Sequence, residues 1–268
     1  MSSEQNGKRT YSAPAAACAA QILRAFRTSS SPLSLADIER QLEQSKSLIY
    51  RVLHELVDHG FVARDLNGRY RLGIETFEMG TAYLNQAGFT EVVREILQEL
   101  AKEAQETVNL GLLRGGEVMY VMKFVGPSSY VTISRVGGRV PANCIAVGKA
   151  LLARLPDSEI RKLLTDPLPQ MTPNSISSVD ELIQSLAQVR EIGYGCDVEE
   201  AALGRCGLAV AVKGVEPTGE LAALSVSTDS ITFPQRQAEL LELLRGASDR
   251  IEREAIARSS LSAVGGLD

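Results

Sequence analysis

Hydrophobic residues recur at helical spacing between positions 46 and 59 and then alternate over the next dozen residues. The helical stretch places its apolar side chains on one continuous face, at Leu48, Ile49, Val52, Leu53, Leu56 and Val57. Its other side is polar and partly basic, with Lys46, Ser47, Tyr50, Arg51 and His54. Residues 61–73 alternate on both sides of Asn67-Gly68, and this pattern predicts a β-hairpin.

Two further helices are predicted upstream of this stretch. Residues 13–27 are rich in alanine and carry apolar side chains at helical spacing. Ser34 then precedes the apolar-periodic run 35–42, and Asp37 follows it by three residues. A serine and a carboxylate at that spacing are typical of a helix N-terminus with a capping box.

The short spacing between the second and third helices indicates how the predicted helices are connected. Only residues 43–45 separate them, and Gly60 is placed to end the third helix just beyond its C-terminus. Helix, helix, short turn, helix and hairpin is the order of a winged helix-turn-helix. We therefore expect such a domain over 13–73, preceded by a polar, disordered tail at 1–12.

The rest of the chain predicts an α+β domain at 89–257, joined by a linker helix at 74–88 and followed by a loose tail at 258–268. We expect a mostly antiparallel sheet, because short strand-like runs follow one another closely. Strands are expected at 107–113, 117–125, 130–136, 207–215 and 220–227. Helices are expected at 90–105, 148–155, 157–165, 178–192 and 234–256.

Composition and charge narrow the class of protein. The 268 residues are 44% hydrophobic and 23% charged, which is typical of a soluble globular chain of two domains. No apolar run is long enough for a membrane span, no secretory signal is visible, and the four cysteines form no CxxC pair. We therefore expect a cytoplasmic protein without a membrane partner.

The charge is distributed unevenly along the chain. Residues 1–72 hold 10 Lys and Arg against 7 Asp and Glu, a net of +3. The remainder holds 18 basic and 26 acidic residues, a net of −8. A basic N-terminal third on an acidic body favours a polyanion as the partner of the first domain.

The sequence offers few residues that could support an enzymatic activity. Both histidines, His54 and His59, lie in the third helix, so the distal domain lacks a histidine base for a serine or cysteine nucleophile. Gly148-Lys149 is similar to the end of a phosphate-binding loop but lacks the preceding glycine and the following hydroxyl residue. We expect Lys149 to point to water, and we expect no metal, no cofactor and no enzymatic activity.

Several motifs in order resemble the IclR family of bacterial transcription regulators. They cover about residues 13–256 and read AQILRAF, SLADIERQL, KSLIYRVLHELVDHGFVAR, GRYRLG, SRVGGRVPANCIAVGKALLARLP, REIGYGCDVEE and GELAALSVS. The resemblance implies a winged helix-turn-helix followed by a GAF-like effector domain. It also implies a homodimer, or a dimer of dimers, bound to a double-stranded DNA operator.

The chain departs from the family pattern at a few positions. Glu43-Gln44 stands in the turn where a small residue or glycine is usual, and a residue at positive φ would be strained there. Tyr50 stands where histidine is common, and Leu48 where threonine is common. The segment 142–145 lacks the usual histidine and hydroxyl residue, which favours a ligand with apolar bulk.

Two groups of residues carry the expected function. For DNA contact we expect the start of the third helix and the hairpin to act, through Lys46, Ser47, Tyr50, Arg51, Arg64 and Arg69. Arg51 has an alternative partner in Glu55, four residues on. For the effector, the resemblance implies Ala146, Val147, Asp197, Cys206, Ser225 and Ser227. For Asp197, a capping or turn role is the main alternative to direct contact with an anion.

The sequence thus predicts a sequence-specific DNA-binding regulator, acting as a repressor or an activator, whose operator affinity responds to a small organic acid. Two alternatives remain open. One is a ligand-sensing or enzymatic α+β domain with an accessory helix-turn-helix. The other is an architectural DNA binder of low specificity without a ligand.

Overall fold

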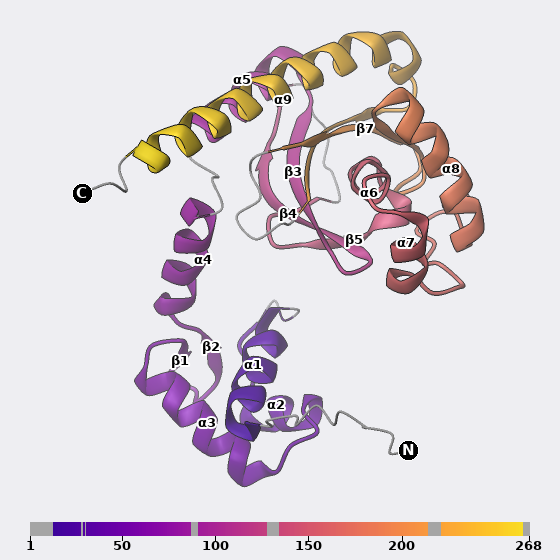
Figure 1. Ribbon diagram of the computed structural model, residues 1–268. Helices are drawn as coiled ribbons and strands as arrows, with labels where there is room; N and C mark the ends of the chain where they lie inside the picture. The colour runs from indigo at the N-terminus through magenta and orange to yellow at the C-terminus, as the bar shows by residue number, and fades with distance from the viewer. Residues whose placement is uncertain are drawn as a thin grey trace, which may run out of the picture. The chain divides into compact units, whose positions relative to one another are not determined.

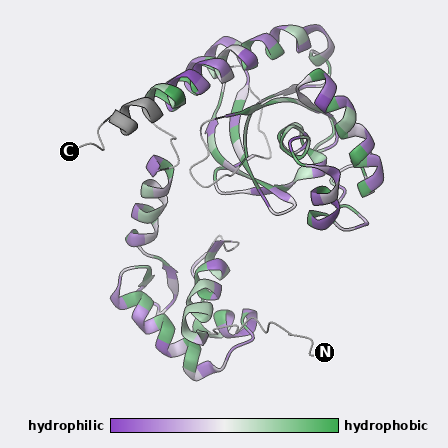
Figure 2. Ribbon diagram, in the orientation of Figure 1, coloured by the Kyte–Doolittle hydropathy of each residue, from purple (hydrophilic) through white to green (hydrophobic). Residues whose placement is uncertain are grey.

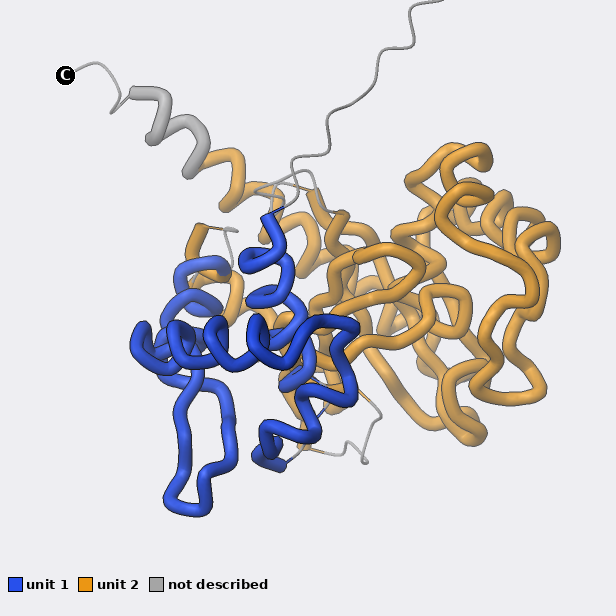
Figure 3. The backbone as a smooth tube through the Cα atoms, turned by 90° about the horizontal axis from the view of Figure 1, so that it is seen from below, with its two compact units in different colours: residues 1–83 blue, residues 84–268 orange. Residues whose placement is uncertain are grey.

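The computed structural model describes residues 13–27, 29, 31–86, 91–127, 134–213 and 221–264, with side chains to residue 257. The chain divides into two compact units, residues 1–83 and 84–268 (Figure 3). The boundary falls inside the helix that we expected to link the two domains. The expectation for a disordered tail at 1–12 lies outside the described residues.

The first unit is a three-helix core with a β-hairpin, so the winged helix-turn-helix is confirmed. Its elements are α1 (Pro14–Arg27), α2 (Leu35–Gln41), α3 (Lys46–Asp58), β1 (Val62–Arg64), β2 (Tyr70–Leu72) and α4 (Ile74–Gln86). The core is assembled from one apolar face of each helix, and it includes Ile22, Ile38, Ile49 and Leu53, all less than 2% exposed. Burial of these faces orients α3 within the unit.

Local signals fix the helix ends. The Ser34 side chain accepts from Asp37 N (3.2 Å) while Asp37 Oδ2 accepts from Ser34 N (2.9 Å), which completes the predicted capping box. Ser45 caps α3 by accepting from Leu48 N (3.3 Å). Gly60 follows α3 with φ +74°, a conformation that favours glycine. The described turn at residues 43–45 contains no residue with positive φ, so Glu43 and Gln44 introduce no such strain.

The second unit contains a six-stranded sheet in the order β5-β4-β3-β8-β7-β6, with every neighbouring pair antiparallel. The strands are β3 (Thr107–Arg114), β4 (Glu117–Phe124), β5 (Arg139–Pro141), β6 (Gly195–Val198), β7 (Arg205–Val212) and β8 (Ala222–Asp229). The helices are α5 (Glu91–Ala104), α6 (Ala146–Leu152), α7 (Asp157–Leu163), α8 (Val179–Ile192) and α9 (Phe233–Val264), with a 3₁₀ turn at Ala142–Cys144. The predicted antiparallel α+β domain is therefore confirmed.

Helices cover both faces of this sheet. Helices α5 and α9 pack on one face, and α6 packs on the other, in contact with β3, β4, β6, β7 and β8 (Figure 1). Helix α8 packs on α6, and its buried side chains recur at helical spacing. Hydrophobic and hydrophilic residues therefore alternate along this helix (Figure 2). The α6 face of the sheet thus lies inside the unit.

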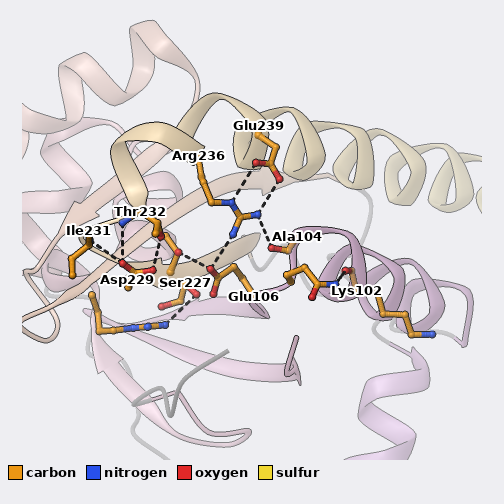
Figure 4. A network of polar contacts seen from close by, with 12 residues as sticks. Lys102, Ala104, Glu106, Ser227, Asp229, Ile231, Thr232, Arg236 and Glu239 are labelled. Atoms are coloured by element: carbon orange, nitrogen blue, oxygen red, sulfur yellow. Dashed lines mark hydrogen bonds and ion pairs between the residues drawn. The ribbon is translucent and has the colours of Figure 1, made fainter. Parts of the chain in front are cut away.

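A polar network joins the ends of α5, β8 and α9 (Figure 4). Glu106 Oε1 accepts from Thr228 Oγ1 (2.7 Å) and from Arg236 Nη1 (3.1 Å), and Arg236 Nη2 donates to Ala104 O (2.8 Å). Burial raises the pKa of Glu106, while the hydrogen bond from Thr228 opposes that rise. These bonds hold the α5–β3 junction against the start of α9.

Some element predictions were wrong. The strands β5 and β6 were not predicted, since three or four residues give too short an alternating pattern. Of the strand expected at 130–136, residues 130–133 lie outside the described residues and 134–136 are not in a strand. Helix α6 begins at Ala146 rather than 148. Helix α9 continues to Val264, so residues 258–264, expected in the loose tail, are helical.

Candidate DNA-binding surface and ligand cavity

The start of α3 presents a polar face to solvent. Lys46, Ser47, Tyr50 and Arg51 recur at i, i+1, i+4 and i+5, so they share one side of the helix, and all four are exposed. Arg51 Nε donates to Ser47 O (3.3 Å) rather than pairing with Glu55, whose carboxylate faces His59. Lys46 Nζ lies 3.2 Å from Glu39 of α2. This is the geometry of a helix that can enter a DNA groove.

The hairpin adds two exposed arginines beside α3. Gly68, with φ +74°, allows the turn between β1 and β2, and Asp65 Oδ1 accepts from the backbone of Asn67 and Arg69 (2.9 Å each). The Arg64 guanidinium lies over the Tyr70 ring at 5.6 Å from its centroid. Arg69 Nη1 donates weakly to Pro32 O (3.5 Å). Both cations therefore remain accessible to phosphate.

A cavity with an empty volume of about 580 Å³, part of it open to solvent, lies between α6 and the sheet of the second unit. It brings together all six residues predicted for effector contact, Ala146, Val147, Asp197, Cys206, Ser225 and Ser227. The fold thus places these six residues, which the sequence separates by up to 81 positions, around one space.

Strand register explains why these residues meet. Ser227 of β8 lies opposite Gly207 of β7, and Gly207 lies opposite Asp197 of β6. Residues opposite one another share a sheet face, so Ser225, two residues before Ser227, is on that face as well. A Cβ on Gly207 would meet Asp197 Oδ2 at 2.4 Å, which shows that this face is the one that carries the carboxylate.

Asp197 caps α6 from the neighbouring strand. Its Oδ2 accepts from Ala146 N (3.0 Å), so the alternative role as a capping carboxylate is what the structure shows. The carboxyl group is buried, and burial raises its pKa from an ordinary value of 3.8 to about 7, against the opposing effect of the bond from Ala146. Burial of the Tyr120 hydroxyl and the nearby Asp197 carboxylate together raise the pKa of that hydroxyl. Asp197 therefore changes charge near neutral pH.

The thiols of β6 and β7 are not activated. Burial raises the pKa of Cys206 to about 11 and that of Cys196 to about 12, and all four cysteines of the chain are free. A thiol with a raised pKa is a poor nucleophile at neutral pH. Buried thiols of this kind contribute packing.

Four polar residues of the cavity wall were missed by the sequence reasoning. They are Asn109 on β3, Tyr120 on β4, Ser134 before β5 and Arg205 at the start of β7. Asn109 is the single polar side chain within the apolar run of β3 after Thr107, which was the one available signal. Finding Arg205 requires the pairing of β7 with β8, which the sequence does not state.

Lys149 does not point to water, so that prediction was wrong. It is 4% exposed, and its Nζ lies 2.5 Å from Glu200 Oε1 in the segment between β6 and β7. A buried ammonium requires such a partner. Asn143 and Cys144 also turn away from the cavity, since both donate to Pro169 O. Only Ile145 of the segment 142–145 lines the cavity.

The part of the chain that the structure describes contains neither a metal-binding cluster nor a membrane-spanning helix. There, no group of three or more His, Cys, Asp and Glu side chains is arranged to hold a metal ion. None of the helices described combines the length and the apolar character needed to cross a bilayer.

Sequence and structure comparisons agree with this two-unit arrangement. Residues 81–253 match the C-terminal domain of the bacterial transcriptional regulator IclR, and residues 15–66 match the IclR helix-turn-helix domain. An HTH-type transcriptional regulator of Mycobacterium tuberculosis is 35% identical over 90% of this chain and 92% of its own length. XynR of Escherichia coli is 36% identical over 78% and 84%. A crystal structure of an IclR transcriptional regulator from Alicyclobacillus acidocaldarius is similar at a TM-score of 0.77, with 26% identity over 91% of this chain and 100% of that one.

Proposed function

Because the chain belongs to the IclR family of bacterial transcriptional regulators, we propose that it binds a specific operator as a dimer and that a small organic acid in the cavity changes its affinity for that operator. The exposed polar start of α3 is the single observation that carries the DNA-binding half of this proposal. A helix of this kind reads base edges with its first residues.

The roles of the individual side chains follow from their chemistry. Arg51 is placed to contact a guanine edge or a phosphate, and Tyr50 a thymine methyl group or the backbone. Lys46 and Ser47, at the helix N-terminus, suit phosphate. Arg64 and Arg69 of the hairpin extend the contact to flanking phosphates or the minor groove.

Dimer formation is supported by α4, the helix that contains the unit boundary. Its Ile74 and Phe77 side chains are 65% and 69% exposed, and no α4 side chain is buried within the chain. Apolar side chains exposed in this number on one helix favour a partner surface. A second copy of the chain would cover them and would place two α3 helices on one operator.

The effector half of the proposal is supported by the cavity. Its wall combines apolar side chains with a few convergent polar groups, which is the usual composition of a small-molecule site. A ligand changes DNA affinity only through its difference in affinity for the two states of the protein. Typical coupling of ~1–3 kcal/mol corresponds to about a 5- to 150-fold change in operator affinity.

Selection of genomic fragments on the purified full chain, followed by DNase footprinting of the selected fragments, tests the proposal. We expect a discrete protected site with two half-sites separated by about one helical turn of DNA or a multiple of it. Uniform protection of all fragments would contradict the proposal and would identify an architectural binder of low specificity.

A further inference from the structure

Two buried atoms of the cavity wall lack a hydrogen-bond partner. They are Asn109 Oδ1, which has no donor among the described residues, and Arg205 Nε, which has no acceptor among them. A buried polar atom left unpaired is destabilising, so an exception calls for a group that is supplied from outside the chain. The two atoms differ in kind, because one accepts a hydrogen bond and the other donates one.

The Arg205 end calls for an anion. Its Nη2 donates to the backbone carbonyl of Ser227 (3.3 Å), which holds the guanidinium against β8 and leaves Nε unused. No carboxylate among the described residues lies within salt-bridge distance of Arg205, and Asp229, its register partner, is bonded to Thr232 and Ile231 instead. A guanidinium with a free N–H and no carboxylate paired to it at salt-bridge distance is suited to a carboxylate ligand.

The Asn109 end calls for a donor. Asn109 is 2% exposed, and its Oδ1 is an amide oxygen that can only accept. A hydroxyl or N–H group would satisfy it, whereas a second carboxylate would face it with another acceptor. This end therefore disfavours dicarboxylates.

Register gives the separation of the backbone positions beside the two ends. Asn109 lies opposite Ser225 on the neighbouring strand, and Ser225 lies two residues from Ser227, whose carbonyl holds the guanidinium. Two residues along a strand and one strand across correspond to roughly 8 Å between backbone positions. A hydroxyl on the carbon next to the carboxylate would be too close to reach both ends.

From these observations we propose that the cavity selects a small monocarboxylate that carries a hydroxyl or N–H donor several bonds from the carboxylate. The carboxylate binds Arg205, and the donor binds Asn109 Oδ1. Asn109 and Arg205 are then specificity-determining residues of the effector site. This assignment rests on the proposed function of the cavity, and it names the chemical class of the ligand.

Calorimetric titration of the full chain with two matched pairs of acids tests the assignment. The pairs are 4-hydroxyphenylacetate with phenylacetate, and 5-hydroxypentanoate with pentanoate. In at least one pair we expect the hydroxylated acid to bind about tenfold more tightly, the effect of one buried hydrogen bond. Asn109→Leu should abolish this preference and leave the affinity for the plain acid unchanged. Arg205→Gln should weaken binding of both members by about 10- to 100-fold.

A control variant and the possible outcomes distinguish failure of this assignment from failure of the proposed function. Arg154→Gln removes an exposed arginine outside the cavity wall and should leave every affinity unchanged. Equal affinity of the wild-type chain for both members of both pairs, or no binding of any of the four acids, would overturn the assignment without the need for a variant. Unchanged binding in Arg205→Gln would overturn the anion end. Failure of the operator footprint, by contrast, would overturn the proposed function.

Discussion

Replacement of Asp197 by asparagine should stabilise the second unit at alkaline pH and much less at acidic pH. Asparagine keeps an oxygen that can accept from Ala146 N, so the cap of α6 is retained, but it carries no charge to bury. The wild-type carboxyl group has a pKa of about 7 in the folded chain, raised by burial from an ordinary value of 3.8. The folded chain therefore holds a proton that the unfolded chain has released between these two values.

The sign and size of the effect follow from this difference in proton binding. Below about pH 4 the group is neutral in both states, so burial carries no charge penalty. As the pH rises from about 4 toward 7, ionisation of the carboxyl group in the unfolded chain lowers the free energy of unfolding by about 1.4 kcal/mol per pH unit. Above pH 7 the full loss is about 4 kcal/mol. Between pH 5 and pH 8, the advantage of Asp197→Asn in the free energy of unfolding should grow by about 2 to 3 kcal/mol.

Urea unfolding followed by circular dichroism at pH 5 and pH 8 measures this difference on the ligand-free chain. Asp249→Asn is the matched control, because Asp249 is exposed on α9, and its pH dependence should follow that of the wild type within about 0.5 kcal/mol. An advantage of Asp197→Asn that is the same at both pH values would refute the reasoning, since it would mean that the carboxyl group does not titrate in this range.

Three further predictions concern binding. Arg51→Ala should weaken operator binding by about 1–3 kcal/mol with an unchanged unfolding temperature, measured by fluorescence anisotropy; unchanged affinity would remove Arg51 from the interface. Ser225→Ala combined with Ser227→Ala should abolish the ligand-induced change in operator affinity while DNA binding persists, and loss of DNA binding would instead indicate a structural role. Phe77→Ser should raise the dimer dissociation constant about 10- to 100-fold in analytical ultracentrifugation, because an exposed apolar ring on α4 is lost; an unchanged constant would exclude this face of α4.

The parts of the fold that the sequence predicted are those that local signals determine. The Ser34–Asp37 capping box sets the start of α2, and Asn67-Gly68 sets the hairpin turn, each within a few residues. Each signal is complete within one short window of the chain. The order of three helices and a hairpin could therefore be predicted without knowledge of the distant contacts.

The parts that the sequence did not predict depend on pairing across the chain. The burial of Lys149 follows from its contact with Glu200, 51 residues away. Asn109 and Arg205 reach the same cavity because β3 and β7 both pair with β8. The six effector residues came from the family resemblance, which carries this pairing implicitly, whereas Asn109 and Arg205 required the strand register itself.

The ratio of affinities for the selected operator and for a scrambled duplex of the same length and composition tests the central claim most directly. Both affinities are measured by anisotropy at one physiological salt concentration. The two duplexes carry the same phosphate charge and differ only in the order of their bases. A sequence-specific regulator predicts a preference of about 10³ or more for the operator. Equal affinity for the two duplexes would contradict the account.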